Sequence, residues 1–184
     1  MIENLSWHAK RMQQTQKEVF NLENSLDLME YLQIPKNFQD GLVKCRILYS
    51  SSIEKIEFHP YQIRPINNLK VIYNDQIDYT YKSEDRTTLT QLFQQREIFD
   101  DIIIVKNGLV TDSYYANLVF DDGVQLFTPR LPLLRGIQRA KLLEAQSIQE
   151  ADIRLEDFPK FEQVHLINAM MGLGECVVKI KNVR

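Results

Sequence analysis

Apolar side chains recur along the first third of the chain with helix-like and then strand-like spacing. Residues 6–20, beginning at Ser6 as an N-cap, carry apolar positions on one helical stripe, and a shorter helical pattern begins at Ser25. Residues 42–49 then read as a strand with Val43, Cys45, Ile47 and Tyr49 on one face, and residues 53–59 as its neighbour with Ile56 and Phe58 on one face. This part therefore predicts two helices followed by a pair of neighbouring strands.

Beyond Pro60 and Pro65, which bracket a short connection, the pattern becomes richer in strands. Asn107-Gly108 is the strongest hairpin signal in the chain. Strands are predicted over residues 69–73, 101–106, 116–120, 124–128, 164–169 and 176–180, and helices over residues 85–96 and 133–143. The sequence thus predicts a mixed α+β fold with a small α/β domain, residues 1–62, and a larger domain of mostly antiparallel strands, residues 66–184.

Composition and charge exclude several classes of protein. The 184 residues are 44% hydrophobic and 26% charged, with a formal net charge of −3, so neither nucleic acid nor an anionic membrane is an expected partner. Only Cys45 and Cys176 carry thiols, and no Cys or His pair stands at metal-ligand spacing. With no apolar stretch of membrane-spanning length and no signal peptide, we expect a cytoplasmic protein without a metal.

Four segments combine residues suited to one kind of chemistry. They are residues 78–86 with Lys82 and Arg86, residues 107–120 with Asp112, residues 128–139 with Gly136, and the separated stretches 8–12 and 167–171. In this order and spacing they resemble the class IV aminotransferases, pyridoxal-phosphate enzymes of fold type IV. The resemblance runs from His8 to about Gly174 and is closest to the 4-amino-4-deoxychorismate lyase branch.

The resemblance implies that Lys82 is the catalytic residue and holds the cofactor aldehyde as a Schiff base. Only a primary amine forms that reversible bond, and we expect the lysine to be partly desolvated so that it can also transfer protons. Asp112 stands where the family carries Glu beside the pyridine nitrogen, and its carboxylate would keep that nitrogen protonated. Taken alone, Lys82 is more often a solvated lysine before a helix, and Asp112 an ordinary acid at a turn or a strand edge.

The resemblance also implies a set of residues around the cofactor phosphate. Exposed amides at a helix start, a glycine that permits close approach and an arginine fork all suit a phosphate. The implied residues are Arg11, Gly136, Ile137, Gln138, Asn168 and Ala169. Each alone has a simpler interpretation, such as a solvent-facing Arg or a loop-to-helix glycine.

Two further features bear on the substrate. Arg46 faces away from the apolar side of its strand and matches a substrate-facing Arg of the branched-chain enzymes, although a solvent-facing role is equally consistent. The sequence begins almost at the family's first helix, without the strand that usually precedes it, which indicates either a misassigned or truncated start or a minimal small domain. That strand carries residues that discriminate substrates, so its absence weakens the prediction of a specific substrate.

The resemblance implies a homodimer acting on an amino-acid-like substrate in folate biosynthesis. We expect aminodeoxychorismate lyase activity, which eliminates pyruvate and gives 4-aminobenzoate. The first alternative is a branched-chain or D-amino-acid aminotransferase, and the second is a non-catalytic relative that keeps the fold. Lys82 and the acid at position 112 argue against the second alternative.

Overall fold

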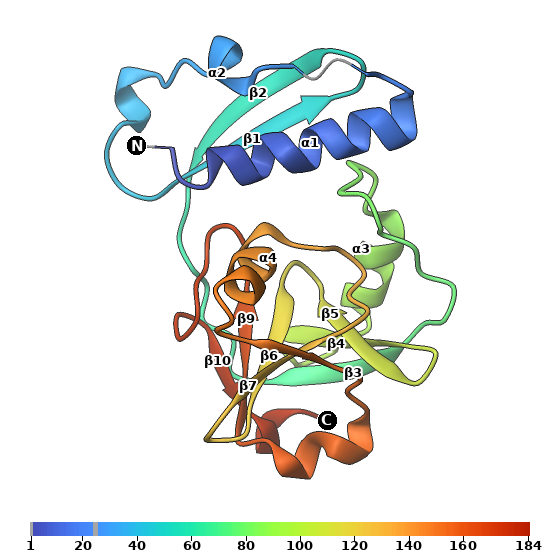
Figure 1. Ribbon diagram of the computed structural model, residues 1–184. Helices are drawn as coiled ribbons and strands as arrows, with labels where there is room; N and C mark the ends of the chain where they lie inside the picture. Colours follow the sequence, from blue (N-terminus) through green and yellow to red (C-terminus); the bar gives the residue numbers. More distant parts are fainter. Residues whose placement is uncertain (1, 24–25) are drawn as a thin grey trace. The chain divides into compact units, whose positions relative to one another are not determined.

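The computed structural model describes residues 2–23 and 26–184 and divides the chain into two compact units, Met1–Gln62 and Ile63–Arg184 (Figure 1). Each unit contains its own sheet. Ser25, from which the second helix was predicted to run, lies outside the described residues. Within the described part, no helix is long and apolar enough to cross a membrane.

The N-terminal unit pairs a helix with a two-stranded ribbon. Helix α1 (Leu5–Phe20) precedes the antiparallel strands β1 (Val43–Tyr49) and β2 (Ile53–Pro60). The side-chain amide of Gln16, buried on α1, donates to the carbonyl of Ser50 in the turn between the strands, at 3.2 Å. This contact ties the helix to the ribbon, and Figure 1 shows α1 running along β1 and β2.

The N-terminal unit departs from the sequence predictions at three points. Helix α1 follows Asn4 in a left-handed conformation rather than Ser6. The next helix, α2 (Leu28–Tyr31), is a single turn that starts where the carboxylate of Asp27 accepts from the amide of Met29 at 2.9 Å, and a 3-10 turn, η1 (Lys36–Phe38), follows it. Cys45, predicted on an apolar strand face, is exposed, because a two-stranded ribbon buries few side chains.

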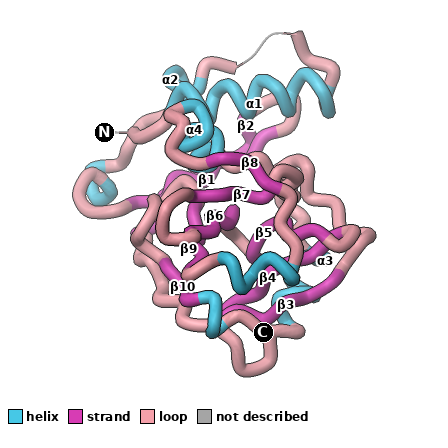
Figure 2. Tube along the Cα trace, turned by 60° about the horizontal axis from the view of Figure 1, so that its bottom comes forward, coloured by secondary structure: helices cyan, strands magenta, loops and turns pink. Residues whose placement is uncertain are grey.

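The C-terminal unit is built on one eight-stranded sheet. Its strands are β3 (Leu69–Tyr73), β4 (Asp101–Lys106), β5 (Leu109–Ser113), β6 (Asn117–Asp121), β7 (Leu126–Pro129), β8 (Gln149–Ala151), β9 (Gln163–Ile167) and β10 (Val177–Lys179). Neighbouring strands follow the order β10-β9-β6-β5-β4-β3, and β7 joins β6 to β8 (Figure 2). Only the pairs β3–β4 and β7–β8 are parallel among the pairings of the described strands.

Strand β4 explains how the unit is packed. Ile103 and Val105 belong to a large apolar cluster, and Ile102 and Ile104 belong to a second cluster with helix α3 (Thr87–Gln94). The strand is therefore buried on both faces, which accounts for its unbroken apolar run. The remaining elements are helix α4 (Ile137–Glu144) and the 3-10 turns η2 (Leu155–Lys160) and η3 (Ile180–Asn182).

The hairpin between β4 and β5 matches its predicted turn. Asn107 and Gly108 both have positive φ, 51° and 74°, as a two-residue hairpin turn of type I′ requires. The backbone amide of Asn107 also donates to the carboxylate of Asp75 at 2.6 Å. This turn sets the register that brings β5, and with it Asp112, beside β4.

Candidate active site

Strand register places three polar or strand-end residues in a row across the C-terminal sheet. Asp112 of β5 pairs with Asn117 of β6, and Asn117 pairs with Ile167 of β9. Asn168 follows Ile167 directly. Strands β5 and β9, which are about fifty residues apart in sequence, are therefore joined through Asn117 of β6.

Asp112 is a buried acid held by two hydrogen bonds. Its side chain is 5% exposed. Oδ1 accepts from the side-chain amide of Asn117 at 2.7 Å, and Oδ2 accepts from the backbone amide of Leu134 at 2.9 Å. Burial raises the pKa of Asp112 to about 7, although both hydrogen bonds and the charge of Arg139 oppose this rise. Near neutral pH, Asp112 is thus poised between its protonated and ionised forms.

Asn117 joins that acid to the loop before α4. Its amide nitrogen donates both to Asp112 and to the carbonyl of Leu134, the latter at 2.8 Å. Its Oδ1 lies 2.0 Å from the point where a β-carbon on Gly136 would stand. Position 136 therefore has to be glycine if Asn117 is to keep this place.

The first turn of α4 lies beside a loop from the far end of the sequence. The helix begins directly after Gly136, without a side-chain cap, so the amides of Ile137 and Gln138 have no partner inside the helix. The positive end of the helix dipole points the same way, and the two effects together favour an anion. The Gln138 side-chain nitrogen lies 3.8 Å from the β-carbon position of Gly172, which places the residues after β9 next to this helix start.

The structure corrects the predicted strand at Asn168 and Ala169. Strand β9 ends at Ile167, and residues 168–171 form a tight turn in which the amide of Met171 donates to the Asn168 carbonyl at 3.1 Å. The Asn168 carboxamide oxygen also accepts from the amide of Met170 at 2.7 Å. An Asn side chain that bonds its own backbone two residues on favours a turn over a strand, and Ala169 is left exposed at its tip.

Lys82 lies on an exposed part of the loop formed by residues 74–86, which we name the Lys82 loop. The prediction of a partly desolvated lysine is wrong for this structure, because the loop before α3 leaves the side chain exposed. Hydrogen bonds order the loop around it: the Tyr79 hydroxyl donates to the Ser83 carbonyl at 3.0 Å, and the Asp85 amide donates to the Ser83 hydroxyl at 3.2 Å.

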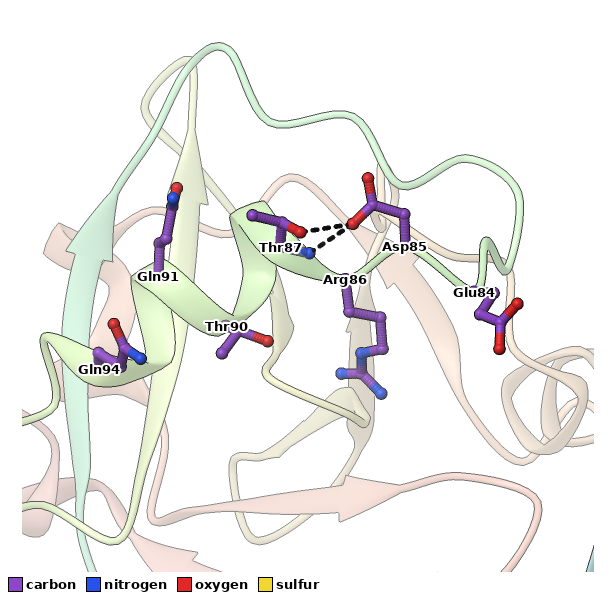
Figure 3. A pocket seen from close by; sticks show the side chains of 7 residues that line it. All are labelled: Glu84, Asp85, Arg86, Thr87, Thr90, Gln91 and Gln94. Atoms are coloured by element: carbon purple, nitrogen blue, oxygen red, sulfur yellow. Dashed lines mark hydrogen bonds between the residues drawn. The ribbon is translucent and has the colours of Figure 1, made fainter.

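Two cavities border the Lys82 loop. One, of about 240 Å³, lies between Tyr79 and Thr80 on the loop and Pro132 and Leu133 before α4. The other, of about 550 Å³, is an open groove lined by residues 84–87 and by α3 (Figure 3). Thus the loop that carries Lys82 and the loop that follows β7 share the wall of one cavity.

Arg11 and Arg46 belong to the N-terminal unit. Arg11 is half-buried on α1, and its carbonyl accepts from the Thr15 hydroxyl at 3.1 Å. Arg46 makes a cross-strand ion pair with Glu57 at 2.7 Å, and Lys55 and Arg46 together lower the pKa of Glu57 to about 2. The predicted roles of Arg11 at the phosphate and of Arg46 at the substrate remain predictions.

Other polar residues of the 128–139 segment hold strands together. The Thr128 hydroxyl donates to the Leu118 carbonyl at 2.8 Å, tying β7 to β6. The Arg139 guanidinium donates to the Pro129 carbonyl at 2.8 Å and pairs with Glu150 at 2.7 Å. These contacts fix the strand that leads into the loop carrying Leu134 and Gly136.

Asn117 and Arg86 were not among the predicted site residues, although the sequence held a signal for each. Asn is unfavourable inside strands, so a buried Asn between Ala116 and Leu118 indicates a specific hydrogen-bonding role. Arg86 was noted only for its spacing from Lys82. What the sequence could not show was which carbonyl or carboxylate each side chain reaches.

Comparison with known proteins places this arrangement in a family. The model of the amino-transferase class IV family matches residues 1–177. The chain belongs to the class IV aminotransferases. It is therefore an enzyme of the fold type IV group, as the residue pattern had implied, and the mixed α/β architecture agrees with that assignment.

Individual proteins are similar to this chain over most of its length. A candidate 4-amino-4-deoxychorismate lyase from Haemophilus somnus 129PT is 37% identical, with a TM-score of 0.84 over 93% of this chain and 91% of that chain. An uncharacterized protein from Haemophilus influenzae is 37% identical over 94% of this chain and 93% of its own length. A hypothetical aminotransferase from Mycobacterium tuberculosis, in a pyridoxal-phosphate-bound form, shares the fold, with 15% identity and a TM-score of 0.74.

Proposed function

We propose that this class IV aminotransferase family member binds pyridoxal phosphate and acts as a 4-amino-4-deoxychorismate lyase, eliminating pyruvate to give 4-aminobenzoate. The observation that carries the cofactor assignment is the buried Asp112 carboxyl, held by Asn117 and by the Leu134 amide beside the start of α4. The resemblance to the Haemophilus somnus lyase candidate, at 37% identity over most of both chains, favours the lyase.

The described residues fit pyridoxal phosphate by their chemistry. That cofactor supplies an aldehyde for an amine and a ring that delocalises negative charge. A lysine amine, a buried acid and a helix start with unpaired amides are the three groups its aldehyde, ring nitrogen and phosphate require. Lys82, Asp112 and the first turn of α4 supply them within the C-terminal unit.

Each residue then has a defined task. Asp112, with a pKa raised to about 7 by burial, ionises readily once a protonated ring nitrogen lies beside it, because an opposite charge favours the carboxylate. Asn117 and the Leu134 amide orient that carboxylate. Lys82 would hold the cofactor aldehyde, and its amine would serve as the acid and base that moves a proton. Gly136, Ile137, Gln138 and Asn168 would hold the phosphate, and Arg11 is proposed to join them.

A branched-chain or D-amino-acid aminotransferase is the second proposal. Class IV aminotransferases share the cofactor groups, and the M. tuberculosis protein is named as a hypothetical aminotransferase. The two reactions differ in one requirement: elimination needs no acceptor, whereas transamination consumes a keto acid. We also propose a homodimer, with Arg46 near the substrate carboxylate in either case.

The product distribution tests the proposal. The enzyme, loaded with pyridoxal phosphate, is mixed with 4-amino-4-deoxychorismate and no keto acid, and pyruvate and 4-aminobenzoate are measured. Many turnovers per enzyme are expected, and they should disappear in Lys82→Ala. A single turnover with branched-chain or D-amino acids, reset by a 2-keto acid, would reverse the choice in favour of the aminotransferase. No response to any amino substrate would contradict both and indicate a relative that has lost catalysis.

A further inference from the structure

Arg86 follows Lys82 by four residues, and its side chain crosses from the Lys82 loop to the connection after Asp112. We propose that Arg86 is a positioning residue that fixes the Lys82 loop relative to Asp112. The proposal rests on the function proposed above, because that function requires Lys82 and Asp112 to lie at a fixed distance from each other.

The contacts of Arg86 converge on Tyr114. One terminal nitrogen donates to the Tyr114 carbonyl at 2.5 Å, and the guanidinium carbon lies 4.5 Å from the centre of the Tyr114 ring. The Tyr79 ring, on the Lys82 loop itself, lies 5.8 Å from the same carbon. Figure 3 shows the Arg86 side chain pointing to the side of its segment opposite to Asp85. Arg86 is thus held at one end by its own loop and at the other by the β5–β6 connection.

Tyr114 is a firm anchor that lies two residues after Asp112. Its ring stacks on Phe93 of α3 with 4.2 Å between the ring centres. Its backbone amide faces the buried carboxylate of Asp101 at 3.4 Å. Because the Tyr114 ring is packed, its carbonyl moves little, and the hydrogen bond to that carbonyl therefore fixes the Arg86 guanidinium.

The segment between Arg86 and Lys82 is short and internally bonded. The Asp85 carboxylate accepts from the Thr87 amide at 2.9 Å and from the Thr87 hydroxyl at 2.7 Å (Figure 3). The Asp85 amide in turn bonds the Ser83 hydroxyl. These bonds make residues 83–87 move as one piece, so displacement of Arg86 displaces the backbone of Lys82.

The chemistry of the contact requires arginine rather than any cation. A planar guanidinium can stack on an aromatic ring and donate in its plane to a carbonyl at the same time, whereas an ammonium group acts as a point charge. Arg96 offers a matched comparison, because it also stacks on a ring, that of Phe93 at 4.0 Å, and donates to the Phe93 carbonyl at 3.1 Å. These two contacts are to Phe93 of α3 rather than to the Lys82 loop.

The test measures cofactor attachment rather than turnover. Pyridoxal phosphate is added to wild type, Arg86→Met, Arg86→Lys and Arg96→Met, and the fraction fixed on Lys82 by borohydride is followed over time. Reversible binding is measured by fluorescence in Lys82→Ala and in Lys82→Ala/Arg86→Met. We expect attachment about tenfold slower or more in Arg86→Met, a partial loss in Arg86→Lys, wild-type attachment in Arg96→Met, and equal binding by the two Lys82→Ala proteins.

Two results would overturn the assignment of Arg86. The first is attachment of the cofactor at the wild-type rate in Arg86→Met. The second is weaker reversible binding in Lys82→Ala/Arg86→Met than in Lys82→Ala, by as much as attachment falls in Arg86→Met. That result would mean that Arg86 supports the fold in general. If Arg86→Met does not fold, Arg86→Lys provides the same comparison. Failure of the wild type itself to attach cofactor would instead overturn the proposed function, and this inference with it.

Discussion

The carboxamide oxygen of Asn117 lies 2.0 Å from the position that a β-carbon on Gly136 would take. The same carboxamide donates to Asp112 and to the Leu134 carbonyl. Because the three contacts share one side chain, a change at Gly136 reaches the buried acid without touching it. The glycine, the amide and the acid therefore act as one unit, although they lie on a loop and two strands.

Gly136→Ala should destabilise the protein by about 1–3 kcal/mol, because the new methyl group must displace Asn117 from a packed site. Urea unfolding measures this cost. Gly172→Ala is the control, since its added β-carbon meets other atoms only at 3.4 Å and beyond. Equal stability of the two variants would show that Asn117 moves aside freely and does not hold Asp112.

Asn117→Ala should raise the pKa of Asp112 above its present value of about 7, because the variant loses a hydrogen bond that favours the ionised form. It should also cost about 1–3 kcal/mol for the buried acceptors left without a donor. Carboxyl ¹³C titration by NMR reports the pKa directly. Asn182→Ala removes an exposed amide donor to the Asn67 carbonyl and should leave the Asp112 titration unchanged.

The two buried acids predict how stability depends on pH. Burial raises the pKa of Asp101 from 3.8 to about 6 and that of Asp112 from 3.8 to about 7. Between the unfolded and folded pKa values, the folded protein holds protons that the unfolded chain has released, so its stability falls as pH rises. We expect the free energy of unfolding of the cofactor-free protein to decline from about pH 4 to about pH 7 through these groups.

Asp101→Asn isolates one contribution to that decline. Oδ1 of Asp101 accepts from the amide of Ile102 at 2.7 Å, whereas Oδ2 is buried without a hydrogen-bond partner among the described residues. An Asn can keep the first contact and no longer ionises. Urea unfolding at several pH values should therefore show a shallower decline up to about pH 6 in this variant. An unchanged slope would contradict the assignment of Asp101 as an acid that keeps its proton.

Asp112→Asn should retain cofactor binding but lose most turnover, because a neutral amide does not stabilise a protonated ring nitrogen. Asp112→Glu restores an acid, the residue that the family resemblance places there, and should recover part of the activity. Steady-state rates and cofactor titrations separate the two effects. Full activity in Asp112→Asn would show that Asp112 is not the partner of the ring.

Local sequence patterns predicted the strands and turns of the sheet better than the hydrogen bonds of the candidate site. The apolar run of β4 and the Asn107-Gly108 turn are decided by residues close in sequence, and both were located correctly. Residues 168 and 169 were predicted as the end of a strand, because the apolar pattern around them gave no indication that Asn168 would bond its own backbone. Short-range bonds of this kind compete with strand pairing and are not visible in hydrophobic periodicity.

The contacts that organise the site are long-range, which is why the sequence alone did not supply them. Asn117 reaches Leu134, and Arg86 reaches Tyr114, across 17 and 28 residues. The resemblance named Lys82 and Asp112 but not the side chains that would orient them. The exposure of Lys82 likewise depends on how its loop packs, and no residue pattern near it determines that packing.

Mapping of the attached cofactor tests the central claim most directly. The protein is incubated with pyridoxal phosphate, reduced with borohydride and digested, and the labelled peptide is identified by mass spectrometry, with Lys82→Ala and the exposed-lysine variant Lys160→Ala as controls. The account predicts a single labelled lysine, Lys82, with label lost in Lys82→Ala and kept in Lys160→Ala. A label on any other lysine, or one that persists in Lys82→Ala, would contradict the assignment of Lys82 as the cofactor lysine.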